Sequence, residues 1–479
     1  MAALNQEKKD PQKKKLLVVD TMGTRYELLN KIGEGGQGSV WATNYDNVLA
    51  KVSNERNPEK LHARRKKLSW IMRQNLDGLH IAKPVALIDK PNRVVGYIME
   101  LMDGLVPLKD SLEESFNALT DGQSLEGYVK TGGLERRLKL LQELAKTLAD
   151  VHARGFAYGD LSPDNIFVSH SVEYSEVWLI DCDNLSVNER LGQDYIFTPG
   201  FAAPEIIKQL SGINVATDIW SFSVIAFKLL TLCHPFESGF RVEDGDPDVE
   251  LESAYKGELP WIYDENDDSN AWAESGVPLA LVSTKKIRSL FDNCFSEGRS
   301  DPGSRPSMAE WSEALDEAIS VLRVCENETD CGVHFIYNKS AICTFCDAEQ
   351  VNESCILLMQ YYFNNSDVCE GNRLVKTGAC QTLNVRDSVQ IRLAPAGTTH
   401  HKESPLICTL SFDVEHGIII QPEPDNELHL LKQSTARSVV VTRKMRLNFD
   451  KRGSQTYQLH INQNKLVGEG FYQVWTFKW

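Results

Sequence analysis

Short runs of alternating apolar and polar residues dominate the first hundred positions of the chain. Four such runs, separated by turn residues, predict the strands of a small sheet: 26–33, 38–43, 48–52 and 94–101. One segment between them, roughly Pro58 to Arg73, has helical character, with Asn57 as its cap and proline at its first position. The pattern predicts a strand-rich lobe that carries one helix.

The apolar spacing changes twice further along the chain. It becomes helical at Leu134, in the segments 134–155, 217–232 and 307–324. Beyond about residue 350, strand-like runs alternate with turn residues: 355–363, 388–394, 406–414, 417–422, 438–449, 457–463 and 472–479. A helix-rich lobe should therefore follow the first lobe, and an all-β sandwich or barrel should end the chain.

Composition and charge narrow the class of protein. A chain of 479 residues predicts two or three domains. The longest apolar run, 221–236, contains Lys228 and is too short to span a membrane, and the N-terminus lacks the apolar stretch of a secretory signal. Eleven cysteines then fit a reducing cytoplasm. The net charge of −16 disfavours nucleic acid as a partner.

A glycine-rich segment supplies the first candidate chemistry. Gly33, Gly35 and Gly38 lie between two predicted strands, and Val40 and Lys51 follow on strands. In a dinucleotide-binding fold a helix would follow the glycines directly. A strand follows here, which is typical of a hairpin that covers nucleotide phosphates while a lysine on the next strand reaches them. Without the glycines, Lys51 would be interpreted as a solvated edge residue.

A second group of polar residues lies about 110 positions later, after a long amphipathic helix. Asp160 and Asn165 are five positions apart on a predicted loop, and Asp181 ends a following strand. Phosphoryl transfer needs one carboxylate to orient the acceptor hydroxyl and oxygen ligands to hold Mg²⁺. Each residue alone would be an ordinary turn residue, but their order and spacing together favour this chemistry.

With these motifs the chain resembles the eukaryotic-like bacterial Ser/Thr protein kinases over roughly residues 26 to 320. The resemblance implies a two-lobed α+β fold with ATP and Mg²⁺ (or Mn²⁺) as cofactors and a protein Ser/Thr hydroxyl as acceptor. It implies these roles: Asp160 as catalytic base, Asn165 and Asp181 as magnesium ligands, Lys51 on the α/β-phosphates, Gly33, Gly35, Gly38 and Val40 around ATP, Met99 as gatekeeper, and Glu100 and Met102 as the hinge that meets adenine.

Later motifs extend the resemblance. The segment 198–205 looks like the end of an activation loop, Asp218 like the start of the central buried helix, and Arg305 like the partner of Glu205. The segments 257–264 and 301–307 are similar to one bacterial subfamily, encoded beside metal-dependent Ser/Thr phosphatases and von Willebrand A-type proteins in tellurite-resistance-like clusters. Such proteins are the partners that this resemblance implies.

The departures from the family pattern are concentrated near the expected active site. Tyr158-Gly159 replaces His-Arg, Ser162 replaces a lysine, and Cys182-Asp183 replaces Phe-Gly. No glutamate lies between Glu59 and Glu100, where the helix partner of Lys51 is expected; the helix positions hold arginines and lysines, from 64 to 67. Glu55 or Glu59 could substitute. The alternative to an atypical kinase is therefore a nucleotide-binding pseudokinase scaffold, with a small-molecule kinase less favoured.

Cysteines gather directly after the kinase-like region. Cys331 and His334, then Cys343 and Cys346, form two pairs with two intervening residues each, which favours a structural zinc ribbon or knuckle; Cys325 is the alternative first ligand. Unrelated buried thiols are the simpler alternative. The expected regions are a polar tail (1–22), an N-lobe (23–102), a C-lobe (103–322), a zinc module (323–350) and a β-rich accessory domain (351–479) without recognisable chemistry.

Overall fold

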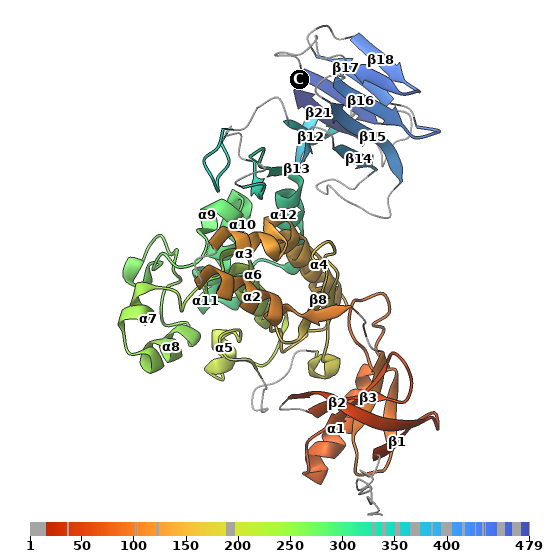
Figure 1. Ribbon diagram of the computed structural model, residues 1–479, viewed down its shortest axis with the longest axis vertical. Helices are drawn as coiled ribbons and strands as arrows, with labels where there is room; N and C mark the ends of the chain where they lie inside the picture. Colours follow the sequence, from red (N-terminus) through yellow and green to blue (C-terminus); the bar gives the residue numbers. More distant parts are fainter. Residues whose placement is uncertain are drawn as a thin grey trace, which may run out of the picture.

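The computed structural model contains two lobes, a small cysteine-containing region and a C-terminal pair of sheets (Figure 1). The structure describes residues 16–35, 38–100, 102, 104–120, 124–187, 197–327, 331–337, 342–349, 355–364, 374–384, 387–393, 405–413, 417–426, 428–433, 435, 437–447, 456–461 and 471–478. The C-lobe lies between the N-lobe and the C-terminal sheets, which occupy opposite ends of the view (Figure 1).

The N-lobe is a closed barrel with one helix on its outside. Its strand order is β1-β2-β3-β4-β6-β5. The elements are β1 (Leu16–Asp20), β2 (Arg25–Gly35), β3 (Gly38–Thr43), β4 (Val48–Ser53), α1 (Pro58–Ile71), β5 (Ala86–Lys90) and β6 (Gly96–Glu100). The predicted cap is confirmed, because the Asn57 side chain accepts hydrogen bonds from the backbone N–H groups of Glu59 and Lys60. Helix α1 packs on the barrel through Leu68, beside Leu49 and Tyr97.

Strand β1 lies inside the stretch that was predicted to be a polar tail. It pairs with both β2 and β5 and so closes the barrel. Val18 is fully buried, and the Asp20 carboxylate accepts hydrogen bonds from the backbone of Met22 and Thr24 and from the Tyr26 hydroxyl. The lysine-rich residues before β1 hid this strand in the sequence pattern, so the sheet begins earlier than we expected.

The C-lobe is built mainly from helices around α6. Its elements are β7 (Leu105–Pro107), α2 (Leu108–Thr120), α3 (Ser124–Lys130), α4 (Gly133–Ala153), β8 (Ile166–Ser169), β9 (Val177–Leu179), η1 (Cys182–Asn184), α5 (Pro204–Ile207), α6 (Val215–Thr231), α7 (Phe240–Asp244), α8 (Pro247–Tyr255), η2 (Asp268–Asn270), α9 (Leu279–Val282), α10 (Lys285–Phe295), α11 (Glu297–Ser300), η3 (Pro302–Ser304) and α12 (Met308–Ser320). Helix α6 starts with a capping box between Asn214 and Thr217, and nearly all of its side chains are buried. No helix in the described part of the chain is long and apolar enough to cross a membrane.

A buried ion pair joins the end of the activation segment to the late part of the C-lobe. Arg305 donates two hydrogen bonds to the Glu205 carboxylate, at 2.7 and 2.8 Å. It also donates to the carbonyls of Gly298 and Ala216 and lies over the Trp220 ring. The predicted pairing of these two residues is confirmed.

The C-terminal domain is a sandwich and not a barrel. One sheet has the order β13-β12-β21-β20-β17-β18 and the other β14-β15-β16-β19, and both contribute to one core. Its strands are β12 (Cys355–Asn364), β13 (Leu374–Asn384), β14 (Ser388–Arg392), β15 (Leu406–Asp413), β16 (Gly417–Pro422), β17 (Leu428–Lys432), β18 (Arg437–Val441), β19 (Met445–Leu447), β20 (Thr456–Ile461) and β21 (Phe471–Lys478). Strands β13 and β17 were not predicted. Cys408 is buried in this core.

The ion pair between Glu205 and Arg305 gives a stability prediction. Glu205→Gln leaves the buried Arg305 charge without its counterion, so the C-lobe should lose about 3–5 kcal/mol of unfolding free energy. Glu250→Gln is the matched control, because Glu250 pairs with Arg241, whose side chain is 47% exposed; it should cost about 1 kcal/mol or less. Chemical denaturation of the full chain checks this. Equal losses in both variants would contradict the role given to the buried pair.

Candidate active site and cysteine cluster

Lys51 occupies the centre of the N-lobe sheet. It lies on β4 opposite Val40 of β3 and Tyr97 of β6, and it is 4% exposed. Gly96 permits this arrangement, because a Cβ at that position would lie 2.1 Å from the Lys51 carbonyl oxygen. The strand on which the lysine lies is therefore held tightly between its neighbours.

The predicted glycine loop is a β-hairpin. Gly33 pairs with Val40 and Gly35 with Gly38, and β4 continues the sheet beside them. A Cβ on Gly38 would lie 2.5 Å from the carbonyl oxygen of Val52, so a side chain there would push the hairpin away from β4. Residues 36 and 37, at the tip of the predicted loop, lie outside the described residues. The hairpin thus has the strand context that the sequence predicted.

The loop that contains Asp160 is held by a carboxylate of the buried helix α6. The backbone N–H groups of Tyr158 and Gly159 donate to the two oxygens of Asp218, at 2.6 and 2.9 Å. His152 Nε2 lies 3.0 Å from the same carboxylate. Gly159 has a φ of 93°, a conformation that favours glycine. The helix core therefore fixes the backbone on which Asp160 is mounted.

The Asp160 carboxylate is partly buried and accepts hydrogen bonds from its neighbours. Asn165 Nδ2 donates to its backbone carbonyl at 2.8 Å and to its Oδ2 at 3.2 Å, and the Thr198 hydroxyl donates to Oδ1 at 3.3 Å. Burial raises its pKa to about 6, although the hydrogen bonds from Thr198 and Asn165 counteract part of this effect. A carboxylate with such a pKa can accept a proton near neutral pH.

Lys51 contacts two carboxylates from the segment that follows β9. Its Nζ lies 2.5 Å from Asp181 Oδ1 and 3.0 Å from Asp183 Oδ1. Arg64 of α1 approaches the other oxygen of Asp183, at 2.5 Å. Burial raises the pKa of Asp181, whereas Lys51 and Arg64 outweigh burial and lower the pKa of Asp183. The predicted residues Lys51 and Asp181 are thus brought together, and Asp183 and Arg64 join them.

The expectation that Glu55 or Glu59 partners Lys51 is not met in this structure. Glu55 accepts hydrogen bonds from the backbone of Arg56 and Asn57 at the start of α1, and the carboxylates beside Lys51 are those of Asp181 and Asp183. Sequence reasoning treated the acidic residue at 183 and the basic helix as two separate departures. The two departures are linked: α1 has Arg64 and no glutamate beside Lys51, and the loop supplies the negative charge through Asp183.

The other predicted nucleotide contacts lie at the end of β6. Met99 is buried opposite Leu49 of β4, Glu100 is exposed and Met102 is partly buried. Their contacts with adenine stay a prediction. Ser162 stands where the family has a lysine. Its side chain is fully buried and uncharged, so this position offers no cation to a phosphate.

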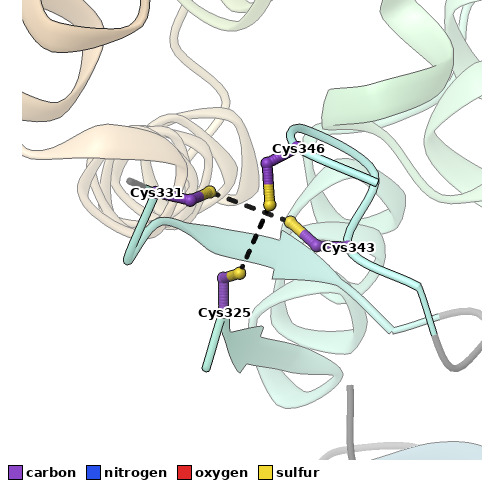
Figure 2. A group of neighbouring side chains, drawn as sticks. All are labelled: Cys325, Cys331, Cys343 and Cys346. Atoms are coloured by element: carbon purple, nitrogen blue, oxygen red, sulfur yellow. Dashed lines mark hydrogen bonds between the residues drawn. The ribbon is translucent and has the colours of Figure 1, made fainter. Parts of the chain in front are cut away.

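Four cysteines converge after α12, on and around the hairpin of β10 (Leu322–Val324) and β11 (His334–Ile336) (Figure 2). The Sγ atoms of Cys325, Cys331, Cys343 and Cys346 all lie within 4.8 Å of one another. Cys325 Sγ is 3.6 Å from Cys346 Sγ, and Cys331 Sγ is 3.9 Å from Cys343 Sγ. These separations exclude disulfides in this arrangement. Residues 322–324, predicted as the end of a helix, form a strand instead.

His334 is not part of this group, contrary to the predicted ligand set. Its Nε2 lies 3.4 Å from Glu135 of α4. Strand alternation explains the difference, because Val333 and Phe335 face the cysteines while His334 and Ile336 face the C-lobe. The short spacing between Cys331 and His334 favoured His334 as a member of the group, but its fourth member is Cys325, which was considered only as a substitute for Cys331.

Comparison with known proteins agrees with this geometry. Residues 26–315 match the protein kinase domain family. The chain belongs to the protein kinase family. Serine/threonine-protein kinase pkn2 of Myxococcus xanthus is 27% identical over 234 residues, which are 44% of this chain and 25% of that protein. PknD of Chlamydia felis is 26% identical over 237 residues, 45% and 25% of the two chains, and cyclin-dependent kinase F-4 of rice is 25% identical over 303 residues, 60% of each.

The protein kinase chain thus spans between a quarter and three fifths of the length of these curated relatives. The matched region begins inside β2, covers most of both lobes and ends inside α12. Protein kinase domains in general use ATP with Mg²⁺ and act on proteins. The cysteine cluster and the β-sandwich lie beyond the matched residues.

Proposed function

We propose that this chain is a Ser/Thr protein kinase that transfers the γ-phosphate of ATP to protein Ser/Thr hydroxyls, its own included, in the cytoplasm. The observation that carries the proposal is the convergence of Lys51, Asp160, Asn165 and Asp181. Lys51 contacts Asp181 directly, and Asn165 contacts Asp160. The likeness to pkn2 and PknD, which are named as serine/threonine-protein kinases, supports the choice of acceptor.

In the proposed reaction Asp160 orients the acceptor hydroxyl and accepts its proton. The acceptor oxygen forms a bond to the γ-phosphorus while the bond from that phosphorus to the β,γ-bridging oxygen breaks, and ADP leaves. Lys51 and the Gly33–Gly38 hairpin hold the phosphates. Asp181 and Asn165 offer the oxygen donors that suit Mg²⁺, which neutralises phosphate charge when it is bound.

Thr198 supports Asp160 in this scheme and is not the first candidate acceptor. Its hydroxyl donates to the Asp160 carboxylate and so holds the side chain in place. The other two hydroxyl residues between 182 and 205 are Ser186, which is buried, and Tyr195, which lies outside the described residues. Because Gly159 replaces the arginine that normally meets a phosphorylated activation loop, we propose that activity does not require that modification.

The competing proposal is a pseudokinase scaffold that binds nucleotide and acts through its C-terminal regions. It explains the departures from the family pattern at 158, 159 and 162. It gives no role to the Asp160 carboxylate, whose pKa is raised to about 6. The accessory sandwich would in either case recruit a protein partner. A metal-dependent Ser/Thr phosphatase and a von Willebrand A-type protein are the partners proposed from the subfamily resemblance.

We also propose that the four-cysteine cluster holds one structural Zn²⁺. With zinc–sulfur distances of about 2.3 Å, the sulfurs of a tetrahedral site lie about 3.8 Å apart. The sulfur–sulfur separations of 3.6 and 3.9 Å fit this value. Among the described residues, the hydrophobic cluster here has only four buried side chains, Cys325, Val333, Phe335 and Cys343, a core too small to be stable alone.

Phosphate transfer from labelled ATP tests the kinase proposal. The wild-type chain with Mg²⁺ should label itself or a general Ser/Thr substrate, whereas Asp160→Ala and Lys51→Ala should lose at least about 10²-fold in rate because they remove the acceptor-orienting and phosphate-holding groups. Measured ATP affinity separates the two, since Asp160→Ala should still bind nucleotide. Equal labelling by all three proteins would refute the assignment, and nucleotide binding without transfer would favour the scaffold.

The pKa of Asp160 predicts the acid side of the pH profile. Below about pH 6 its carboxyl is protonated and cannot accept the hydroxyl proton, so kcat/KM should fall about tenfold per pH unit there and level off above. Thr198→Val removes a hydrogen bond that lowers this pKa and should move the inflection to higher pH. Steady-state rates from pH 5 to 8 check this, and an inflection that ignores the Thr198 substitution would contradict it.

Metal analysis of the full chain tests the zinc site. The wild type should contain about one zinc per chain, and Cys325→Ser should lose it because three sulfurs are left. His334→Ala is the matched control and should keep the metal, since His334 contacts Glu135 and not the cluster. Zinc that survives Cys325→Ser but not His334→Ala would restore the ligand set predicted from the spacing.

A further inference from the structure

Four charged side chains meet where α1 contacts the loop after β9. Lys51 and Arg64 supply two positive charges, and Asp181 and Asp183 two negative ones, so the group is neutral as a whole. The Asp183 side chain is 3% exposed and the Arg64 side chain 20%. A carboxylate buried this deeply requires paired cations, because leaving it unpaired costs several kcal/mol.

The two oxygens of Asp183 are divided between the N-lobe sheet and the N-lobe helix. Oδ1 lies 3.0 Å from Lys51 of β4, and Oδ2 lies 2.5 Å from Arg64 of α1. The Asp183 side chain therefore links β4 to α1. The relative placement of these two elements determines where the Lys51 side chain points. Lys51 needs no carboxylate from α1 in this arrangement.

We propose that Asp183 and Arg64 are positioning residues that together replace the missing helix glutamate. Asp183 orients Lys51 toward the phosphates, and Arg64 fixes α1 to the loop through Asp183. This inference rests on the proposed kinase function and deepens it. Because Asp183 also pairs with Lys51, the Asp181 carboxylate, which lies 2.5 Å from Lys51 here, is not the sole counterion of that lysine.

The same short turn reaches the acceptor side of the site. Asp181 begins it with a left-handed φ of 63°, Asp183 lies within η1, and the Asn184 amide lies 3.5 Å from Asp160 Oδ2. The helix α1, the phosphate-holding lysine and the acceptor carboxylate are thus connected through residues 181–184. A displaced α1 should consequently disturb catalysis as well as nucleotide binding.

Exchange of the charges tests this proposal in the full chain. Arg64→Glu places a carboxylate against Asp183, and Asp183→Gly removes the carboxylate that Lys51 and Arg64 share, so that the single charge of Asp181 faces two cations. The double variant Arg64→Glu/Asp183→Gly offers Lys51 a helix glutamate instead. Lys66→Glu is the matched control, since Lys66 is exposed on the same helix. The measurements are kcat and KM for ATP, ATP affinity by calorimetry, and the unfolding midpoint of each protein.

Each single variant should lower kcat/KM for ATP by about 10²-fold, the scale of a misplaced catalytic group, while Lys66→Glu stays within about twofold. The double variant should recover at least about tenfold over either single variant, because the substituted residues are coupled. The proposal would be overturned if kcat/KM of the single variants stayed within about threefold of wild type. It would also be overturned if the loss of kcat/KM in the double variant equalled the product of the losses in the two single variants.

The two proposals can fail separately. If the wild type binds ATP but transfers no phosphate, the kinase function fails, and the ATP affinities of the same variants decide the positioning role. The expected order is unchanged: both single variants weaken ATP binding and the double variant restores it. Affinities that do not differ from wild type would reject the role of Asp183 and Arg64 even then.

Discussion

Charge neutrality in the buried space behind the phosphate site is the constraint on which the rest of this active site depends. Lys51 cannot be 4% exposed without anionic partners, and each added carboxylate requires a further cation. Asp183 and Arg64 thus compensate each other's charge. Either change alone would leave an uncompensated charge, whereas together they give a neutral group that joins β4, α1 and the segment from Asp181 to Asp183.

In the C-lobe, the loop that contains Asp160 is held in place by hydrogen bonds from its backbone. Asp218 receives the N–H groups of Tyr158 and Gly159, so the buried helix α6 fixes the loop without help from the histidine and arginine that the family usually has there. Tyr158 is itself fully buried and donates to the carbonyl of Ile180, which precedes Asp181. The loop is therefore supported by packing, which is why these two departures are compatible with an ordered acceptor site.

Sequence reasoning located elements and single residues better than it located pairs. Regular apolar spacing identified α4 and α6, and Lys51, Asp160 and Asp181 follow from local motifs that need no long-range information. The link between Arg64 and Asp183 joins positions 119 residues apart, and the fourth cysteine depends on which face of β11 points inward. Both the ion pair and the choice of the fourth cysteine depend on tertiary contacts, about which periodicity and motif spacing carry no information. Strand β1 was missed for a related reason, since it is stabilised by pairing with β5 across the barrel.

The cysteine region belongs physically to the C-lobe. Ile336 is part of the large C-lobe core, and the Phe345 ring lies 6.3 Å from that of Tyr128 on α3. On the other side, Thr382 of β13 donates to the carbonyl of Leu322 in β10 at 2.7 Å. The hairpin of β10 and β11 thus connects the C-lobe to the sandwich, which lies at the end of the C-lobe far from the N-lobe (Figure 1). Because the described part of the sandwich lies far from the hairpin of Gly33 to Gly38, its placement is compatible with the recruitment role proposed for it and gives it no contact with the proposed nucleotide site (Figure 1).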